Sequence, residues 1–138
     1  MLTAQIDALT SENIVGLTTT VMSAFGSDQI RALGTAQIQS LSAAQLSGLS
    51  TSQLSNLVTG SVAALTSSQF ASLNAKQLNA LGTNIEKADT QDIAAVNASV
   101  VAGLTTSAVQ SLTSDQVKAL TKAQAAALSS AQINALGA

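Results

Sequence analysis

The sequence lacks histidine, cysteine, proline, tryptophan and tyrosine, and these absences exclude several kinds of chemistry. Metal sites built from histidine or cysteine are excluded, and disulfide bridges are excluded with them. A serine or threonine nucleophile would lack the histidine that usually serves as its base. The sequence therefore offers no catalytic, cofactor-binding or metal-binding residue, and we expect a protein that is not an enzyme and needs no cofactor.

Charge is also scarce, because only 9% of the residues are charged and only five are basic. Nucleic-acid binding depends on clustered lysine and arginine, and a polybasic membrane anchor needs the same residues. No window reaches the 18 or so apolar residues of a membrane span, because serine, threonine or glutamine interrupts every few positions. We therefore expect neither a nucleic-acid partner nor insertion into a membrane.

What the chain does contain is an eight-residue repeat, Leu-[Ser/Thr]-x-x-Gln-[Leu/Ile/Val]-x-[small]. It accounts for essentially all of residues 1–138, which we expect to form one repeat domain of 17 units. A fragment, Leu136-Gly137-Ala138, begins an eighteenth unit, and the stretch from Leu81 to Lys87 is one residue short. The units start at Met1, Leu9, Leu17, Phe25, Leu33, Leu41, Leu49, Leu57, Leu65, Leu73, Leu81, Ala88, Val96, Leu104, Leu112, Leu120 and Leu128.

Two apolar positions and one small position recur in every unit. We expect the first and sixth residues to point into a core, and the small eighth residue to allow close packing of the backbone. The short stretch keeps its apolar residue at Ile85, so we expect the missing residue to come from a turn. The sixth-position residues are Ile6, Ile14, Met22, Ile30, Ile38, Leu46, Leu54, Val62, Phe70, Leu78, Ile85, Ile93, Val101, Val109, Val117, Ala125 and Ile133.

The spacing predicts a short helix in each unit rather than one long helix or a flat strand. Along a continuous helix the apolar stripe would drift by about 80° per unit, and in a flat strand positions one and six would face opposite sides. The second position holds N-cap residues, and glutamine three residues later completes a capping box. Where the second residue is Gly26, Gly34 or Gly82, we expect it to close the preceding helix and the cap to move one place on.

Helices of five or six residues are unstable alone, so neighbouring units must stack. The predicted fold is an all-α solenoid, a superhelix of very short helices with one helix per unit and two or three units per coil. A β-solenoid is the alternative.

Two sets of charged residues are candidate sites. A lysine could in principle serve as the base for a serine or threonine nucleophile, but Lys76, Lys87, Lys118 and Lys122 lie in outward-looking positions and are expected to be solvated and protonated. Three carboxylates in residues 86–92, Glu86, Asp89 and Asp92, could form a weak calcium site, but their spacing matches no known calcium loop. We favour a solvated irregular turn in which Asp89 is an N-cap.

Two polar columns run through the repeat. The fifth-position glutamines could bind sugars or neighbouring molecules, but capping explains them without a ligand. The third-position hydroxyls could form an ordered face like that of ice-binding proteins, although Ala43, Ala75 and Ala98 interrupt them. The glutamines are Gln5, Gln29, Gln37, Gln45, Gln53, Gln69, Gln77, Gln116, Gln124 and Gln132, and the hydroxyl column includes Thr19, Ser27, Thr35, Thr51, Thr59, Ser67, Thr83 and Thr90.

The segments Leu33-Gly-Thr-Ala-Gln-Ile-Gln-Ser-Leu41 and Leu112-Thr-Ser-Asp-Gln-Val-Lys-Ala-Leu120 resemble a known repeat. They are similar to the Leu-Thr-Thr-x-Gln-Ile/Val-x-Ala-Leu octapeptide arrays of very large bacterial secreted or surface proteins. Those arrays are often labelled adhesin-like or haem-utilisation-related. The resemblance implies export from the cell, but the chain has no haem ligand beyond Met22.

These observations favour a structural protein at the cell surface or outside the cell. We expect a rod that serves as a filament subunit, a stalk or an adhesin spacer. Neither end has a polar capping unit, so we also expect end-to-end self-association or, as the alternative, an origin as a segment of a longer array. The alternative function is a module that binds ice or carbohydrate, with a surface polysaccharide as its partner.

Overall fold

A computed structural model describes residues 3–57 and 59–137, except for the side chain of Thr59. Met1 and Ala138, which the repeat includes, lie outside these residues. Each unit contributes one helix, and the described residues contain no strand, so the β-solenoid alternative has no support. The helices are α1 (Thr3–Asp7), α2 (Ser11–Val15), α3 (Thr19–Ser23), α4 (Ser27–Arg31), α5 (Thr35–Ser40), α6 (Ala43–Ser47), α7 (Thr51–Ser55), α8 (Thr59–Ala64), α9 (Ser67–Ser72), α10 (Ala75–Leu81), the 3-10 helix η1 (Gly82–Lys87), α11 (Thr90–Ala95), α12 (Ala98–Ala102), α13 (Thr106–Gln110), α14 (Ser114–Lys118), α15 (Lys122–Ala127) and α16 (Ser130–Leu136).

The helices start where the capping chemistry predicts. Ser42, the N-cap of α6, has an extended backbone (φ −74°, ψ 162°), and its Oγ accepts a hydrogen bond from the Gln45 amide at 3.1 Å. The Gln45 Oε1 accepts one from the Ser42 amide at 2.9 Å, which completes the capping box. The same reciprocal pair is present at the N-caps Thr10, Ser50, Thr66, Asn74, Thr113, Thr121 and Ser129.

The glycines in the second position divide into two types. Gly26 and Gly34 have extended backbones and are themselves the N-caps of α4 and α5, so the expected shift of the cap is wrong for both. The cap can stay in place because the backbone amides of Gly26 and Gly34 still donate to the glutamine three residues on. Gly82 does close the preceding helix, α10, with a φ of 57°. Glycine suits that position because left-handed backbone is costly for residues with a side chain. The expected move of the cap to Thr83 is wrong, because the next helix, η1, already begins at Gly82.

Most helices pack against the helix three units further along the chain. The pairs include α2 with α5, α6 with α9, α7 with α10, and α13 with α16. The spacing continues across the short unit, where α8 packs against η1, and α9 packs against α11. The repeat in space is therefore three units, about 24 residues, which we call a coil. The sequence pattern left two and three units per coil open.

The apolar positions form one continuous core from Ile6 to Ala135. Sixth-position residues from Ile6 to Val109 are all buried, including Ile85 in the short unit. Burial ends in the last coil, where Ile133 is 52% exposed. The small eighth residue allows adjacent coils to approach closely, as at Gly103, where an added Cβ would lie only 2.7 Å from the Ala75 Cβ.

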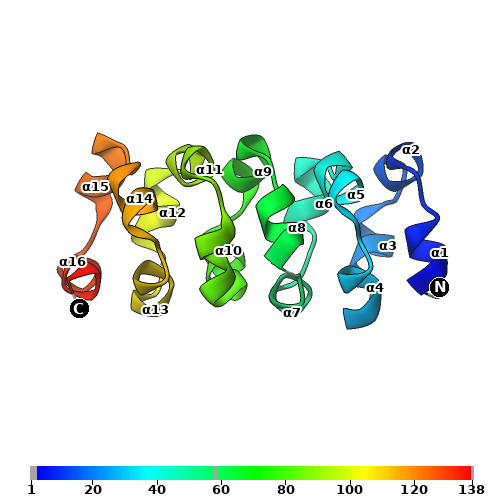
Figure 1. Ribbon diagram of the computed structural model, residues 1–138, viewed down its shortest axis with the longest axis horizontal. Coiled ribbons are helices and arrows are strands. Elements are labelled where there is room, and N and C mark those ends of the chain that lie inside the picture. Colours follow the sequence, from blue (N-terminus) through cyan, green and yellow to red (C-terminus); the bar gives the residue numbers. More distant parts are fainter. Residues whose placement is uncertain (1–2, 58, 138) are drawn as a thin grey trace.

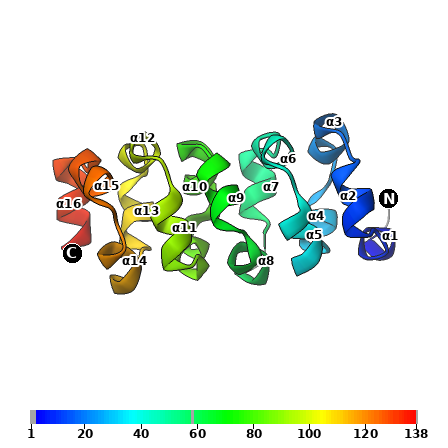
Figure 2. The ribbon, with the colours of Figure 1, turned by 90° about the horizontal axis from the view of Figure 1, so that it is seen from above.

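The coils follow one another along a single direction. Figure 1 shows the helices in an elongated array with the two ends of the chain at opposite ends, and Figure 2 shows the same arrangement from above. The longest α-helices have seven residues. None of the helices formed by residues 3–57 and 59–137 has the length and hydrophobicity needed to cross a membrane.

Candidate functional site

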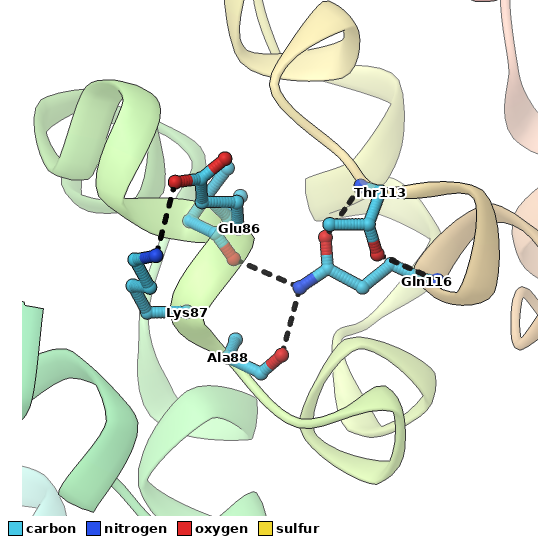
Figure 3. Close-up of polar contacts among 6 residues, drawn as sticks. Glu86, Lys87, Ala88, Thr113 and Gln116 are labelled. Carbon is cyan, nitrogen blue, oxygen red and sulfur yellow. Dashed lines mark hydrogen bonds and ion pairs between the residues drawn. The ribbon is translucent and has the colours of Figure 1, made fainter.

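The glutamine column lies between adjacent coils and is the most regular polar feature of the molecule. Gln116 is 1% exposed and belongs to α14. Its backbone amide and Oε1 form the capping box with Thr113, at 3.2 and 2.8 Å. Its Nε2 donates to the carbonyls of Ile85 (3.0 Å) and Ala88 (2.7 Å), in the coil before (Figure 3). One side chain therefore provides a hydrogen-bond partner for a backbone amide at the start of its own helix and for carbonyls at the end of another helix.

We call this arrangement a glutamine hook, meaning a fifth-position glutamine whose Nε2 donates to two carbonyls of the preceding coil. The acceptors lie 31 and 28 residues earlier, and the donor–acceptor distances run from 2.6 to 3.3 Å. All the hooks are buried, and the described residues contain no buried side-chain nitrogen or oxygen atom without a hydrogen-bond partner. The hooks are made by Gln37, Gln45, Gln53, Gln69, Gln77, Gln116, Gln124 and Gln132.

Four consecutive units in the middle of the array have no glutamine in the fifth position. The residues there are Asn84, Asp92, Val100 and Ala108. Asn84 retains one long bond, from its Nδ2 to the carbonyl of Leu57 at 3.4 Å. Val100 and Ala108 have apolar side chains that donate no hydrogen bond. We call the boundary between residues 57–80 and residues 81–111 the seam.

A different amide crosses the seam. Asn79 Oδ1 accepts from the Thr105 amide at 3.0 Å, and Asn79 Nδ2 donates to the Gly103 carbonyl at 3.3 Å. These bonds connect α10 to the loop after α12. The seam is therefore held by substitute contacts rather than by hooks.

Asp92 occupies the hook position at the seam and is 3% exposed. Its Oδ1 accepts from the Ser67 hydroxyl at 2.8 Å, across to α9, and its Oδ2 accepts from the Asp89 amide at 3.2 Å. Burial raises the pKa of the Asp92 carboxyl; the Ser67 and Asp89 hydrogen bonds lower it, and the Asp89 charge raises it. The expectation of a solvated turn is therefore wrong for Asp92, because the hook position faces the preceding coil. Asp89 is the N-cap residue of α11, as predicted.

The calcium hypothesis finds no matching geometry in the part of the chain that the structure describes. No group of three or more acidic side chains there is placed to hold a metal ion. Glu86 is paired with Lys87 at 3.3 Å. The lysines considered as bases, Lys76, Lys87, Lys118 and Lys122, are all exposed, as expected.

The third-position hydroxyls separate into three columns once the coil has three units. In one column Ser11, Thr35, Thr83, Thr106 and Ser130 are exposed. Thr59 belongs to the same column, but its side chain lies outside the described residues. The alanines that interrupt the sequence pattern fall in the other two columns. One column is thus an unbroken row of serine and threonine.

Two stretches of the chain, residues 22–59 and 85–122, match the ALTTAQ repeat family, and together they cover more than half of its length. The chain belongs to the ALTTAQ repeat family. Read as one-letter code, the name of the ALTTAQ repeat corresponds to positions eight, one, two, three, four and five of the unit, so its last letter is the hook glutamine. The two matches leave out residues 60–84, next to the seam. Comparisons with curated proteins and with solved structures gave no match.

The capping half of the hook was predictable, but its second half was missed. A signal was present in the sequence of this ALTTAQ repeat protein. A capping box accepts glutamate as readily as glutamine, yet none of the 17 fifth positions contains glutamate. Because glutamate has no side-chain donor when ionised, its absence indicates that the glutamine Nε2 donates a hydrogen bond in addition to the cap.

Proposed function

We propose that this chain is a non-catalytic structural protein, a rod-like solenoid outside the cell that serves as filament subunit, stalk or adhesin spacer. The observation that carries the proposal is the packing of helices on the helix three units further, which recurs along the array from α1 to α16. Because every coil adds the same increment, length grows in proportion to the number of units. With neighbouring helix axes about 8–10 Å apart, the described coils extend for roughly 50 Å.

Small-angle X-ray scattering of the dilute protein tests the rod directly. The proposal expects an elongated particle about 50 Å long, in line with the coil spacing. A compact, nearly spherical particle would contradict it. Immunodetection on intact cells of the source organism and in their medium tests the location separately, and signal confined to the cell interior would exclude an extracellular role.

Self-association is part of the proposal and is supported by the outer face of α14–α16. The sixth-position residues Val117, Ala125 and Ile133 on this face are half-buried or exposed, whereas the corresponding residues of earlier coils are buried. This face is formed by the same apolar repeat positions that make the interface between adjacent coils elsewhere in the array. The occupant that matches it is a further coil of the same repeat, supplied by a second copy of the chain.

Sedimentation velocity across a range of concentrations tests this contact, with electron microscopy of the most concentrated sample. We expect larger species as concentration rises, and fewer of them in Ile133→Asp, because a charge on this face would have to be desolvated. Gln39→Asp is the matched control, since Gln39 is exposed within the array and should leave association unchanged. A monomer at all concentrations would remove self-association but would leave the rod intact.

A second candidate function is supported by the unbroken hydroxyl column. Every serine and threonine of this column whose side chain is described is exposed, which gives a row of donors and acceptors along the array. Such a row could bind ice or a surface polysaccharide. The glutamine column is not available for this role, because eight of its side chains are buried in hooks. Inhibition of ice recrystallisation, or a positive signal on a glycan array, supports this candidate if Thr35→Val with Thr106→Val removes it, and blank results in both assays exclude it.

A further inference from the structure

Asp92 is a chemical exception in the glutamine column, and it stands at the seam. A glutamine in its place would direct Nε2 toward the carbonyls of Val62 and Leu65, the counterparts of those bound by the hooks on either side. An ionised carboxylate only accepts hydrogen bonds, so it cannot make either contact. A protonated carboxyl has one O–H and can donate once.

The contacts of Asp92 fit a group that can change its role with protonation. Oδ2 takes the place of the glutamine Oε1, because it accepts from the amide of the N-cap Asp89. Oδ1 takes the place of the Nε2 and lies 2.8 Å from the Ser67 Oγ of α9. When Oδ1 is ionised, the Ser67 hydroxyl must donate to it. When Oδ1 carries a proton, it can donate to the Ser67 Oγ instead, so one hydrogen bond crosses the seam in either state. The two states differ in that the ionised state buries a carboxylate charge against α9.

The charged groups around Asp92 are few. Helix α9, against which α11 packs, carries no ionisable side chain. On the other side, α14 carries Asp115 and Lys118, which are exposed and 3.9 Å apart. Glu86 and Lys87 of η1 form their own exposed pair. Asp89 is the charged residue that acts on Asp92, and its effect is to disfavour a second negative charge.

We propose that Asp92 is a proton-dependent weak point between α11 and α9: its ionisation buries a carboxylate charge against α9 and loosens the seam, and its protonation removes that charge and tightens the seam. The neighbouring positions cannot compensate, because Asn84 makes one long bond and Val100 makes none. The inference depends only on the packing of coils and would stand if the rod had another use.

The sign of the pH effect follows from linkage. Burial raises the pKa of Asp92 in the folded protein above the ordinary value of about 3.9 in the unfolded chain. The folded state therefore holds the proton more tightly, and its contribution to stability is present below the ordinary pKa and lost as pH rises through the folded pKa. Asp92 makes the seam more stable in mild acid than at neutral pH.

The test is thermal unfolding of the whole chain between pH 7.5 and pH 4, comparing Asp92→Gln with the unaltered protein. Glutamine restores the hook, so the variant should melt several degrees higher at neutral pH. The difference in melting temperature should shrink as pH falls through the pKa of Asp92. Asp7→Asn, at an exposed residue of α1, is the control and should show no such convergence. A difference that is constant with pH, or a variant that is less stable at pH 7.5, would overturn the proposal.

Carbon-detected NMR titration of the Asp92 carboxyl keeps the proposal testable if the glutamine variant does not fold. The midpoint in the unaltered protein should lie above the ordinary aspartate range. Ser67→Ala should move the midpoint further upward, because it removes the hydrogen bond that favours the ionised form. A midpoint at or below the ordinary value would contradict the proposed weak point.

Discussion

At the scale of the residue, the fifth-position glutamine combines properties that no other side chain offers at that site. Its oxygen accepts from the N-cap amide, and its nitrogen has two hydrogens for two carbonyls. Glutamate could cap the helix but could not donate, and its charge would have to be buried. Asparagine is one methylene shorter, and at Asn84 it reaches only one carbonyl.

Removal of a hook should cost more than the loss of a helix cap. In Gln53→Ala the amide of Ser50 and the carbonyl of Phe25 lose their glutamine partner, and the Met22 carbonyl keeps only its bond from the Phe25 amide. Buried groups left without a hydrogen bond cost about 1–3 kcal/mol each before relaxation, so we expect about 2–4 kcal/mol in the free energy of unfolding. Urea unfolding measures the change. Gln39→Ala removes an exposed glutamine and should cost less than about 0.5 kcal/mol. Equal effects in the two variants would show that hooks do not stabilise the fold.

Replacement of a hook by glutamate should make stability depend on pH. In Gln69→Glu the new carboxylate would face the carbonyls of Ile38 and Leu41. Burial and these carbonyls should raise its pKa in the folded state, so stability should be lost as pH rises through that pKa and regained in acid. Thermal unfolding at pH 4.5 and pH 7.5 measures the effect. If the variant loses equal stability at both pH values, the glutamate is not buried against the carbonyls.

At the scale of the element, the sequence predicted most of what the structure contains. Ser42, Leu41 and Leu46 were sufficient to predict a short helix with an inward face, because capping and hydrophobic patterning act within one unit. The number of units per coil was not predictable, since it depends on contacts between residues about 24 apart that are similar in every unit. The burial of Asp92 was missed for the same reason.

The backbone conformation of Gly82 gives a prediction for the short unit. Gly82→Ala places a Cβ at a φ of 57°, which should destabilise the protein by about 1 kcal/mol. Gly60→Ala is the matched control, because Gly60 lies inside α8 and an added Cβ there meets nothing within 4 Å. Alanine at that helical site should be neutral or stabilise by up to about 1 kcal/mol. Calorimetric melting of both variants measures the difference, and destabilisation by Gly60→Ala alone would contradict the assigned geometry.

At the scale of the whole molecule, stability should vary along the array. Coils joined by hooks have several buried hydrogen bonds across each boundary, whereas the seam relies on Asn79, Asn84 and Asp92. In repeat proteins the interface between neighbours supplies much of the stability, so a weak interface favours local opening.

Native-state hydrogen exchange tests this distribution. Backbone amides of α11 and α12 should exchange faster than those of α5 and α6, which are joined to the adjacent coils by Gln37, Gln69 and Gln77. The comparison avoids the outermost helices, where fraying would dominate. Uniform protection across these four helices would show that the substitute contacts are as strong as hooks.

The claim on which the whole account depends is that glutamine Nε2 groups join coils of three units. The most direct measurement is NMR spectroscopy of the isotope-labelled protein, with nuclear Overhauser effects recorded from the side-chain amide protons. The account predicts contacts from Gln69 to Ile38 and Leu41, and from Gln124 to Ile93 and Val96, together with slow exchange of these amide protons with water. If each glutamine instead contacted residues about one unit, or eight residues, closer to it in sequence, the coil would have two units and the three-unit coil would be wrong. Rapid exchange of the amide protons without any contact to the preceding coil would contradict the hook.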